Sequence, residues 1–332
     1  MFTTGQLPPS IGWGILGPGR IAEKFCADLA LVGDAHLAAV GSRSAGRAQE
    51  FAHRHGAARW GGYADVLADP EVQIVYIATP HALHVEQTRM ALSAGKAVLC
   101  EKPLTLDADS ARSLFDHADD CGALLLEAMW MTCHPLIHKV RRLLSDPAYG
   151  TPRQIHADLG FVVNADPTDR LVDPAMGAGV LLDMGIYPLT FATYFLGEPR
   201  ELRATAHLSG GIDTNIAIAG SYPNGAVAAL SATMSCQSSR TASIATEIGR
   251  FDFGTNFHHP TSVTWTSYWE PEGVSEVVEP DEPVIGRGYG NEIIEAQRCL
   301  RAGLRQSPLL PREQTLAVLA QMDQIRALIG LR

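Results

Sequence analysis

Short apolar runs alternate with amphipathic helical patterns along residues 11–126, and this alternation restricts the fold more than any other feature of the chain. The runs cover residues 11–16, 36–41, 74–78, 96–100 and 123–126, and the helical patterns cover 21–31, 45–54, 85–93 and 108–119. Continuous apolar strands separated by helices are typical of βαβ units, whose helices bury both faces of a parallel sheet. We therefore expect an α/β domain with a parallel sheet.

The pattern changes after about residue 128. Residues 151–278 are rich in β-branched and small side chains and show helical periodicity only near 185–196. Turn signals such as Pro223-Asn224-Gly225 separate the runs, which is typical of antiparallel hairpins. Two helical patterns, 292–302 and 313–329, follow. We predict two domains, an α/β domain over 1–128 and an α+β domain with a mainly antiparallel sheet over 129–332.

Composition and charge exclude several classes of protein. The chain has 332 residues and a formal net charge of −10, unlike proteins that neutralise nucleic-acid phosphates with a basic face. No stretch reaches the roughly 18 apolar residues of a membrane span, and the start lacks the regions of a signal peptide. The six cysteines are scattered without a C-x-x-C pair, which favours reduced thiols. We expect a cytoplasmic protein that binds neither nucleic acid nor membrane.

A glycine turn lies between the first predicted strand and the first predicted helix. It reads Gly17-Pro18-Gly19-Arg20-Ile21-Ala22 and matches the pattern G-x-G-x-x-G/A. This pattern is significant only directly after a strand and at the start of a helix, which is where it lies here. The first glycine permits a tight turn, and the second lets backbone N–H groups approach a pyrophosphate at the helix start. The turn predicts a Rossmann-type dinucleotide site that includes Gly17, Gly19, Arg20 and Ile21.

The end of the second predicted strand indicates which dinucleotide is bound. NAD enzymes usually place an acidic residue there, about 20 residues after the glycines, to bind the ribose diol. This chain has Ser42 and Arg43 at that point, with Arg47 one helical turn further on. Hydroxyl and guanidinium groups bind a 2′-phosphate, so NADP is favoured over NAD. The alternative is that both arginines are solvated residues of a helix start.

The segment Glu101-Lys102-Pro103 directly follows a predicted strand of the parallel sheet. Ligands of open α/β sheets bind beyond the carboxyl ends of the strands. Lys102 is therefore placed for substrate or cofactor, although most lysines are surface residues.

A second candidate group lies in the other domain. Asp183 and Tyr187 are four residues apart, so a helix would place both on one face. Alcohol oxidation needs a base, and a phenol with a pKa near 10 acts as one only when a nearby cation stabilises its anion. A pairing of Lys102 with Tyr187 would satisfy this need. The residues alone favour the alternative, in which Asp183 caps a helix and Tyr187 belongs to the core.

Together these motifs resemble the Gfo/Idh/MocA family of nucleotide-dependent oxidoreductases. The resemblance also includes Ala78-Thr79-Pro80-His81 with His84, and Leu181 to Tyr187. Tyrosine at position 187, with Glu127 to Trp130 and His134-Pro135, is similar to the branch of trans-1,2-dihydrobenzenediol dehydrogenases and NADP-dependent D-xylose 1-dehydrogenases. Two departures from that branch are Thr132-Cys133 in place of Arg-Phe, and Gly177-Ala178-Gly179 in place of three glycines.

The resemblance implies roles for individual residues. Lys102 and Tyr187 would form the catalytic pair. Reasoning from the residues adds Asp183, which would orient the ammonium or a substrate hydroxyl, and Trp130, the best aromatic candidate for ligand contact because it lies at the domain junction. The cofactor site would extend over Thr79, Pro80, His81, His84, Glu101 and Lys102. The substrate site would lie between the domains, and an open-faced sheet in the second domain would form the interface of a homodimer or a dimer of dimers.

Histidine pairs do not lead us to expect a metal site. His81 and His84 are three residues apart but have no acidic or thiol partner in the motif, and His258-His259 fits a loop pair. We expect an NADP-dependent dehydrogenase or reductase that transfers a hydride to or from a CH–OH group of a sugar or cyclic diol. The alternatives are an enzyme that recycles a tightly held nucleotide and a catalytically silent NADP-binding sensor, which would not need Lys102, Asp183 and Tyr187 together.

Overall fold

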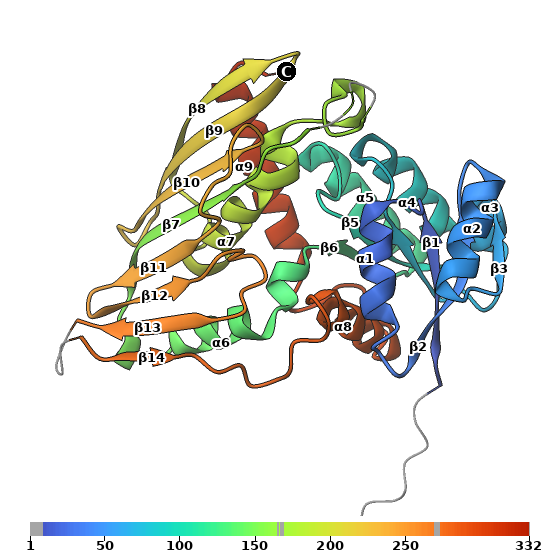
Figure 1. The fold of residues 1–332 in the computed structure, drawn as a ribbon, viewed down its shortest axis with the longest axis horizontal. Helices are drawn as coiled ribbons and strands as arrows, with labels where there is room; N and C mark the ends of the chain where they lie inside the picture. The colour runs from blue at the N-terminus through green and yellow to red at the C-terminus, as the bar shows by residue number, and fades with distance from the viewer. Residues whose placement is uncertain (1–8, 165, 167–168, 269–272, 332) are drawn as a thin grey trace, which may run out of the picture. The chain divides into compact units, whose positions relative to one another are not determined.

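The structure is a computed structural model that describes residues 9–164, 166, 169–268 and 273–331 (Figure 1). The chain forms two compact units. Unit 1 contains residues 1–104, 110–130 and 284–312, and unit 2 contains 105–109, 131–283 and 313–332. The sequence predicts one boundary near residue 128, whereas residues 284–312 belong with the first unit.

The return of the chain to unit 1 has a local physical cause. The carboxylate of Asp28, buried on α1 (Arg20–Leu29), accepts backbone hydrogen bonds from Arg287, Tyr289 and Gly290 at the start of α8 (Tyr289–Arg301). These contacts join residues more than 250 positions apart. Sequence periodicity carries no signal for such pairing.

Unit 1 is built around a six-stranded parallel sheet in the order β3-β2-β1-β4-β5-β6. The strands are β1 (Ile11–Leu16), β2 (Ala35–Gly41), β3 (Arg59–Gly61), β4 (Ile74–Ile77), β5 (Ala97–Glu101) and β6 (Leu125–Ala128). Five of them were predicted. The strand that was not predicted is β3, an edge strand of three residues, which is too short to give a periodic pattern.

Helices accompany these strands as the βαβ pattern requires. Besides α1 and α8 they include α2 (Ala45–His55), α3 (Tyr63–Ala68), α4 (His84–Ser93) and α5 (Ala108–Cys121). Every residue of β1, β4, β5 and β6 is buried, which explains why these strands read as continuous apolar runs. The strand order reverses between β1 and β4, so their carboxyl ends form the crevice where such sheets bind ligands.

Unit 2 contains an eight-stranded sheet in the order β14-β13-β12-β11-β7-β10-β9-β8. Its strands are β7 (Pro152–Gly160), β8 (Glu201–Ser209), β9 (Ile212–Ser221), β10 (Val227–Thr233), β11 (Ala242–Thr246), β12 (Gly249–Phe253), β13 (Val263–Ser267) and β14 (Ser275–Val277). All neighbouring pairs are antiparallel except β7 with β10. The mainly antiparallel prediction is confirmed.

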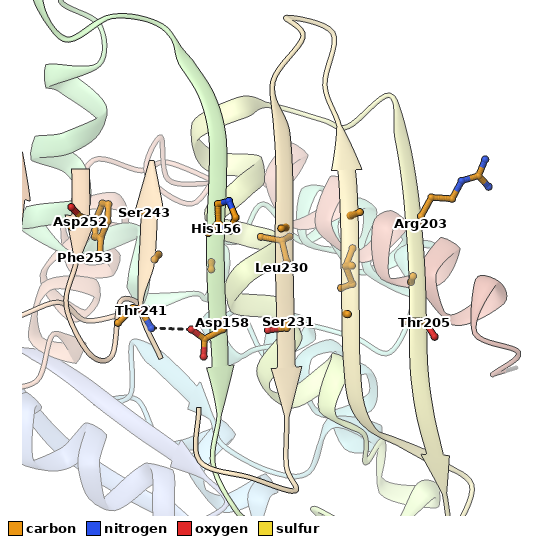
Figure 2. Close-up of a pocket in the computed structure, with 17 residues that line it drawn as sticks. His156, Asp158, Arg203, Thr205, Leu230, Ser231, Thr241, Ser243, Asp252 and Phe253 are labelled. Carbon is orange, nitrogen blue, oxygen red and sulfur yellow. Dashed lines mark hydrogen bonds between the residues drawn. The ribbon is translucent and has the colours of Figure 1, made fainter. Parts of the chain in front are cut away.

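The two faces of this sheet differ in burial. One face packs against α7 (Ile186–Leu196), and its buried residues include Ile155, Ile216 and Ala232. The opposite face carries small and polar side chains around a hollow of about 920 Å³, shown in Figure 2. Alternation along β9 and β10 produces this difference, because successive side chains of a strand point to opposite faces.

Two further helices belong to unit 2, α6 (Pro135–Leu143) and α9 (Arg312–Leu328), the latter from its second residue onward. Thr193 on α7 and Gln321 on α9 are hydrogen-bonded to each other. The helical stretch Pro174–Leu196 is long and apolar enough to cross a membrane, but 78% of its apolar window is buried inside the protein. It is therefore best described as the central helix of the core of unit 2.

Candidate functional site

The glycine turn joins β1 to α1 at the carboxyl edge of the parallel sheet. Gly17 has a φ of +92°, and a Cβ there would lie 2.7 Å from Cγ2 of Thr79, which follows β4. Only glycine combines this backbone conformation with such a close approach. A Cβ on Gly19 would meet nothing within 4 Å. The turn is thus closely packed at its first glycine and open at its second, as the approach of a pyrophosphate requires.

The start of α1 offers hydrogen-bond donors at the same point. The helix begins at Arg20, and no side chain of the described residues caps Gly19 before it. Backbone N–H groups at a helix start carry partial positive charge and bind anions. Arg20 is exposed and Ile21 is half-buried beside them. These residues fit a dinucleotide and would hold its pyrophosphate.

The end of β2 carries the residues predicted to distinguish the two nucleotides. Ser42 is buried, and its hydroxyl accepts the backbone N–H of Ser44 at 3.2 Å, which closes the turn into α2. Arg43 and Arg47 are both exposed next to this turn. The segment from 42 to 47 contains no acidic residue, so its charge suits a phosphate rather than a ribose diol.

His84 connects the loops that follow β4 and β5. Its Nδ1 lies 2.9 Å from the carbonyl oxygen of Pro103, and its Nε2 lies 3.0 Å from that of Thr79. The ring is fully buried, and the ring of His81 packs against it with centroids 5.6 Å apart. His84 therefore positions these loops, and half-buried Pro80 is the more accessible part of the motif.

Lys102 follows β5 at the edge of the sheet where the other cofactor candidates lie. It is half-buried, whereas Glu101 before it is buried and accepts a hydrogen bond from the hydroxyl of Tyr76 on β4. Glu101 is thus engaged within the protein. Of the two predicted residues, Lys102 is the one accessible to a ligand.

Two carboxyl groups and two phenols are buried close together in unit 1, and we refer to Tyr76, Glu101, Tyr289 and Glu292 as the buried acid cluster. Glu292 on α8 is fully buried, and neither of its carboxylate oxygens has a hydrogen-bond partner among the described residues. Burial, and then the charges of Glu101 and Asp28, raise the pKa of Glu292 well above its ordinary value. Its surroundings therefore favour the protonated form of Glu292.

Trp130 contacts the buried acid cluster through Tyr289. Its ring stacks on that of Tyr289 with centroids 4.3 Å apart and planes inclined by 18°. Burial, and then the charge of Glu101, raise the pKa of Tyr289. Since Tyr289 covers one face of the indole, a substrate would have to use another part of the ring.

Asp183 and Tyr187 lie where a π-helical turn leads into α7 in unit 2. Asp183 belongs to a π-helical turn, Leu181–Gly185, and Tyr187 is the second residue of α7. The buried carboxylate of Asp213 on β9 accepts the backbone N–H of Leu181 at 2.7 Å and so holds the start of this turn. Burial raises the pKa of Asp213, and the hydrogen bond from Leu181 opposes this rise.

The glycines before the π-helical turn allow the carboxylate of Asp213 to approach the backbone there. Gly179 has a φ of +138°, and a Cβ there would lie 2.4 Å from Oδ1 of Asp213. Gly177 also has a positive φ, at +78°, whereas Ala178 between them does not. The replacement of the middle glycine by alanine therefore leaves the backbone of this motif unaffected.

Arg170 lies near the carboxylate of Asp183. Its Nη1 is 3.7 Å from Oδ1 of Asp183, and both side chains are partly exposed. Tyr187, in contrast, is only 7% exposed, and its ring contacts that of His258. Unit 2 thus places a carboxylate accessible to a ligand four residues before a buried phenol.

Comparison with known proteins identifies the family. Residues 11–128 match the family model of oxidoreductases with an NAD-binding Rossmann fold, GFO/IDH/MocA, and residues 137–252 match a C-terminal domain of the same family. D-xylose 1-dehydrogenase (NADP(+)) of Hypocrea jecorina is 33% identical over 96% of this chain and 91% of its own. The chain belongs to the Gfo/Idh/MocA oxidoreductase family.

Other relatives span the same length. Trans-1,2-dihydrobenzene-1,2-diol dehydrogenase of Oryctolagus cuniculus is 31% identical over 96% of this chain and 98% of its own. A 3-ketoreductase from Actinomadura kijaniata, solved with NADP and TDP-benzene, has a TM-score of 0.85 and 26% identity over 96% of this chain and 97% of its own. This Gfo/Idh/MocA member therefore matches these oxidoreductases over nearly its whole length, and the Rossmann prediction is confirmed.

Three residues near the candidate site were given no functional role by sequence reasoning. Asp213 and Glu292 lie in ordinary strand and helix patterns, and no local signal marks them. His258 belongs to a histidine pair that was interpreted as a loop feature. Its contact with Tyr187 depends on chain segments about 70 residues apart.

Proposed function

We propose that this Gfo/Idh/MocA protein is an NADP-dependent dehydrogenase or reductase acting on a CH–OH group of a sugar or cyclic diol. The observation that carries the proposal is that one chain holds both halves of the chemistry. Unit 1 has an open glycine turn at a helix start, and unit 2 has a buried phenol with a carboxylate four residues before it. Relatives named for NADP, D-xylose and dihydrodiols support the substrate class.

The choice of NADP rests on the end of β2. Arg43 and Arg47 would bind the 2′-phosphate, with the hydroxyl of Ser42 beside them. The dehydrogenase relative from Hypocrea jecorina is named for NADP(+), and the ketoreductase structure contains NADP. Gly17, Gly19, Arg20 and Ile21 would hold the pyrophosphate, and Thr79, Pro80, His81, Glu101 and Lys102 would line or support the remainder of the cofactor site.

The proposed mechanism assigns proton transfer to the chain's own residues. When bound, the nicotinamide exchanges a hydride with the substrate carbon. Tyr187 takes the hydroxyl proton during oxidation, and the ammonium of Lys102 stabilises its phenolate form. Asp183 accepts a hydrogen bond from a neighbouring substrate hydroxyl, which favours polyhydroxylated substrates. Trp130 contributes apolar surface to the substrate.

The direct test combines purified protein with NADP⁺ or NAD⁺ and a panel of aldoses, polyols and trans-dihydrodiols, with absorbance of the reduced nicotinamide as the readout. We expect turnover of at least one substrate with NADP⁺. Replacing Tyr187 by Phe should lower kcat by roughly 10²-fold or more and leave NADP affinity nearly unchanged. Wild-type turnover in Tyr187→Phe would remove Tyr187 from the mechanism, and ligand binding without any turnover would favour a sensor.

We also propose that the open sheet face of unit 2 binds a second copy of the chain, as a homodimer or a dimer of dimers. This face is lined by small exposed residues such as Ala217, Ala219 and Ala229, which would let two sheets approach closely (Figure 2). A cytoplasmic location is part of the same proposal. It is supported by the six cysteines, none of which forms a disulfide among the described residues.

A further inference from the structure

The loop after β12 brings an imidazole against the candidate catalytic phenol. The ring centroids of Tyr187 and His258 are 4.8 Å apart, and their planes are inclined by 48°. Tyr187 is buried, whereas His258 is half-buried. A proton on the phenol therefore has a titratable neighbour that is closer to solvent than the phenol itself.

Packing one helical turn further along α7 holds this loop in place. Phe257 is fully buried, and its ring meets that of Phe191 edge to face with centroids 5.3 Å apart. Phe191 comes four residues after Tyr187, so both lie on one face of the helix. The backbone N–H of Phe257 also donates to the carbonyl of Arg240 at 3.0 Å. The anchored Phe257 thus fixes the register that places His258 on Tyr187.

Other histidine side chains lie close to His258. The ring of His259 lies 4.5 Å from that of His258. His134 caps α6 by accepting the backbone N–H of Leu136, and burial, followed by His259 and His138, lowers the pKa of His134 to about 4. The titratable groups around His258 include Tyr187 of α7, His259 of its own loop and, beyond it, His134 and His138 of the α6 segment.

We propose that His258 is a positioning residue that relays the proton between Tyr187 and solvent. The inference rests on the proposed role of Tyr187 as the base. During oxidation the substrate C–H bond breaks and its electron pair leaves as hydride to NADP⁺, while the O–H proton passes to the phenolate of Tyr187. The phenol then gives its proton to a ring nitrogen of His258, which releases it to water, and reduction runs through the same steps in reverse.

The ordinary acidities of the two groups suit such a relay. In model compounds a phenol titrates near 10 and an imidazole near 6.5, and a cation beside a phenol, the role proposed for Lys102, brings the two acidities closer. The terminal torsion of histidine is also soft, so a ring nitrogen can turn toward the phenol.

The experiment compares His258→Ala with His258→Phe. The alanine variant leaves space for an added imidazole, whereas the phenylalanine variant keeps an aromatic ring without nitrogens. We expect kcat to fall by about 10- to 100-fold in both with little change in KM. Imidazole in the buffer should restore kcat in His258→Ala in proportion to its concentration and should not restore His258→Phe. His53→Ala, at an exposed position of α2, is the control and should match the wild type with and without imidazole.

A second readout uses cofactor-free protein. The pH titration of the His258 ring protons, followed by nuclear magnetic resonance, should shift its midpoint when Tyr187 is replaced by Phe. Wild-type kcat in His258→Phe, or an unshifted His258 midpoint, would overturn the relay. If Tyr187→Phe is inactive while both His258 variants are fully active, the relay fails and the proposed function survives. Full activity of Tyr187→Phe would refute both.

Discussion

Glu292 allows a direct test of the electrostatics of unit 1. Its carboxyl group is fully buried without a hydrogen-bond partner among the described residues, and burial, followed by Glu101 and Asp28, raises its pKa well above 4.5. The unfolded chain ionises near 4.5, whereas the folded chain keeps the proton. Stability is therefore lost as pH rises above the unfolded pKa, and Glu292→Gln, which has the same shape but no ionisation, should abolish this loss.

The magnitude follows from the linkage between proton binding and folding. Between the unfolded and folded pKa values, the folded state holds one more proton, so the free energy of unfolding falls by about 1.4 kcal/mol per pH unit. Over each two pH units of that interval Glu292 thus lowers stability by about 2.7 kcal/mol, and the loss stops growing once the pH passes the folded pKa. Below about pH 4 both states are protonated, and the effect vanishes.

The assay is thermal unfolding of the wild type and Glu292→Gln at a series of pH values. The difference in Tm between the variant and the wild type should become more positive as pH rises. For a unit of this size each kcal/mol corresponds to about 2–4 °C. Circular dichroism or calorimetry measures this shift.

Glu295 is a matched control on the same helix. Burial raises its pKa, but hydrogen bonds from Arg298 and Ser307 outweigh this effect, so the pKa of Glu295 is lowered. Its stabilising contribution is present above the unfolded pKa and is lost as pH falls, so Glu295→Gln should destabilise most near neutral pH. The reasoning is refuted if Glu292→Gln changes Tm by the same amount at every pH, or follows the sign of Glu295→Gln.

Three further predictions concern the turn, the cofactor and the open face. Gly179→Ala should destabilise unit 2 by about 2–3 kcal/mol, because its Cβ would overlap Asp213. Gly197 also has a positive φ but open space around it, so Gly197→Ala should destabilise by only about 1 kcal/mol. Equal losses of stability in unfolding experiments would contradict this reasoning. Arg43→Ala should weaken NADP binding roughly tenfold or more and leave NAD binding nearly unchanged, as measured by fluorescence titration. Ala219→Arg should convert a dimer to a monomer in sedimentation experiments, and an unchanged dimer would exclude this face.

Local patterns predicted most of unit 1. Strands such as Ile11–Leu16 and Ile74–Ile77 are buried on both faces, so their apolar runs are unambiguous, and the glycine turn adds the strand–helix junction. The strand Arg59–Gly61 escaped notice because three residues at a sheet edge carry no period. The helix Pro135–Leu143 also escaped notice, because a short helix next to a change of pattern gives little periodic signal.

Within the candidate site, sequence reasoning identified residues whose role depends on local geometry. Gly17 and Gly19 follow from the turn, and the spacing of Asp183 and Tyr187 follows from the helix. His84 was expected to bind cofactor, but its fully buried ring braces two loops. Burial of this kind depends on neighbouring chain segments, and the motif itself does not reveal it.

The sequence by itself determined the alternation of strands and helices, the open glycine turn and the absence of an acid at residues 42–47, because periodicity, glycine geometry and charge act over a few neighbouring residues. Only the tertiary structure decided that α8 joins unit 1, that Glu292 is buried beside Glu101, and that His258 lies on Tyr187. These arrangements depend on the packing of segments tens to hundreds of residues apart. Such contacts alter the burial and acidity of a side chain without leaving any pattern in the sequence around it.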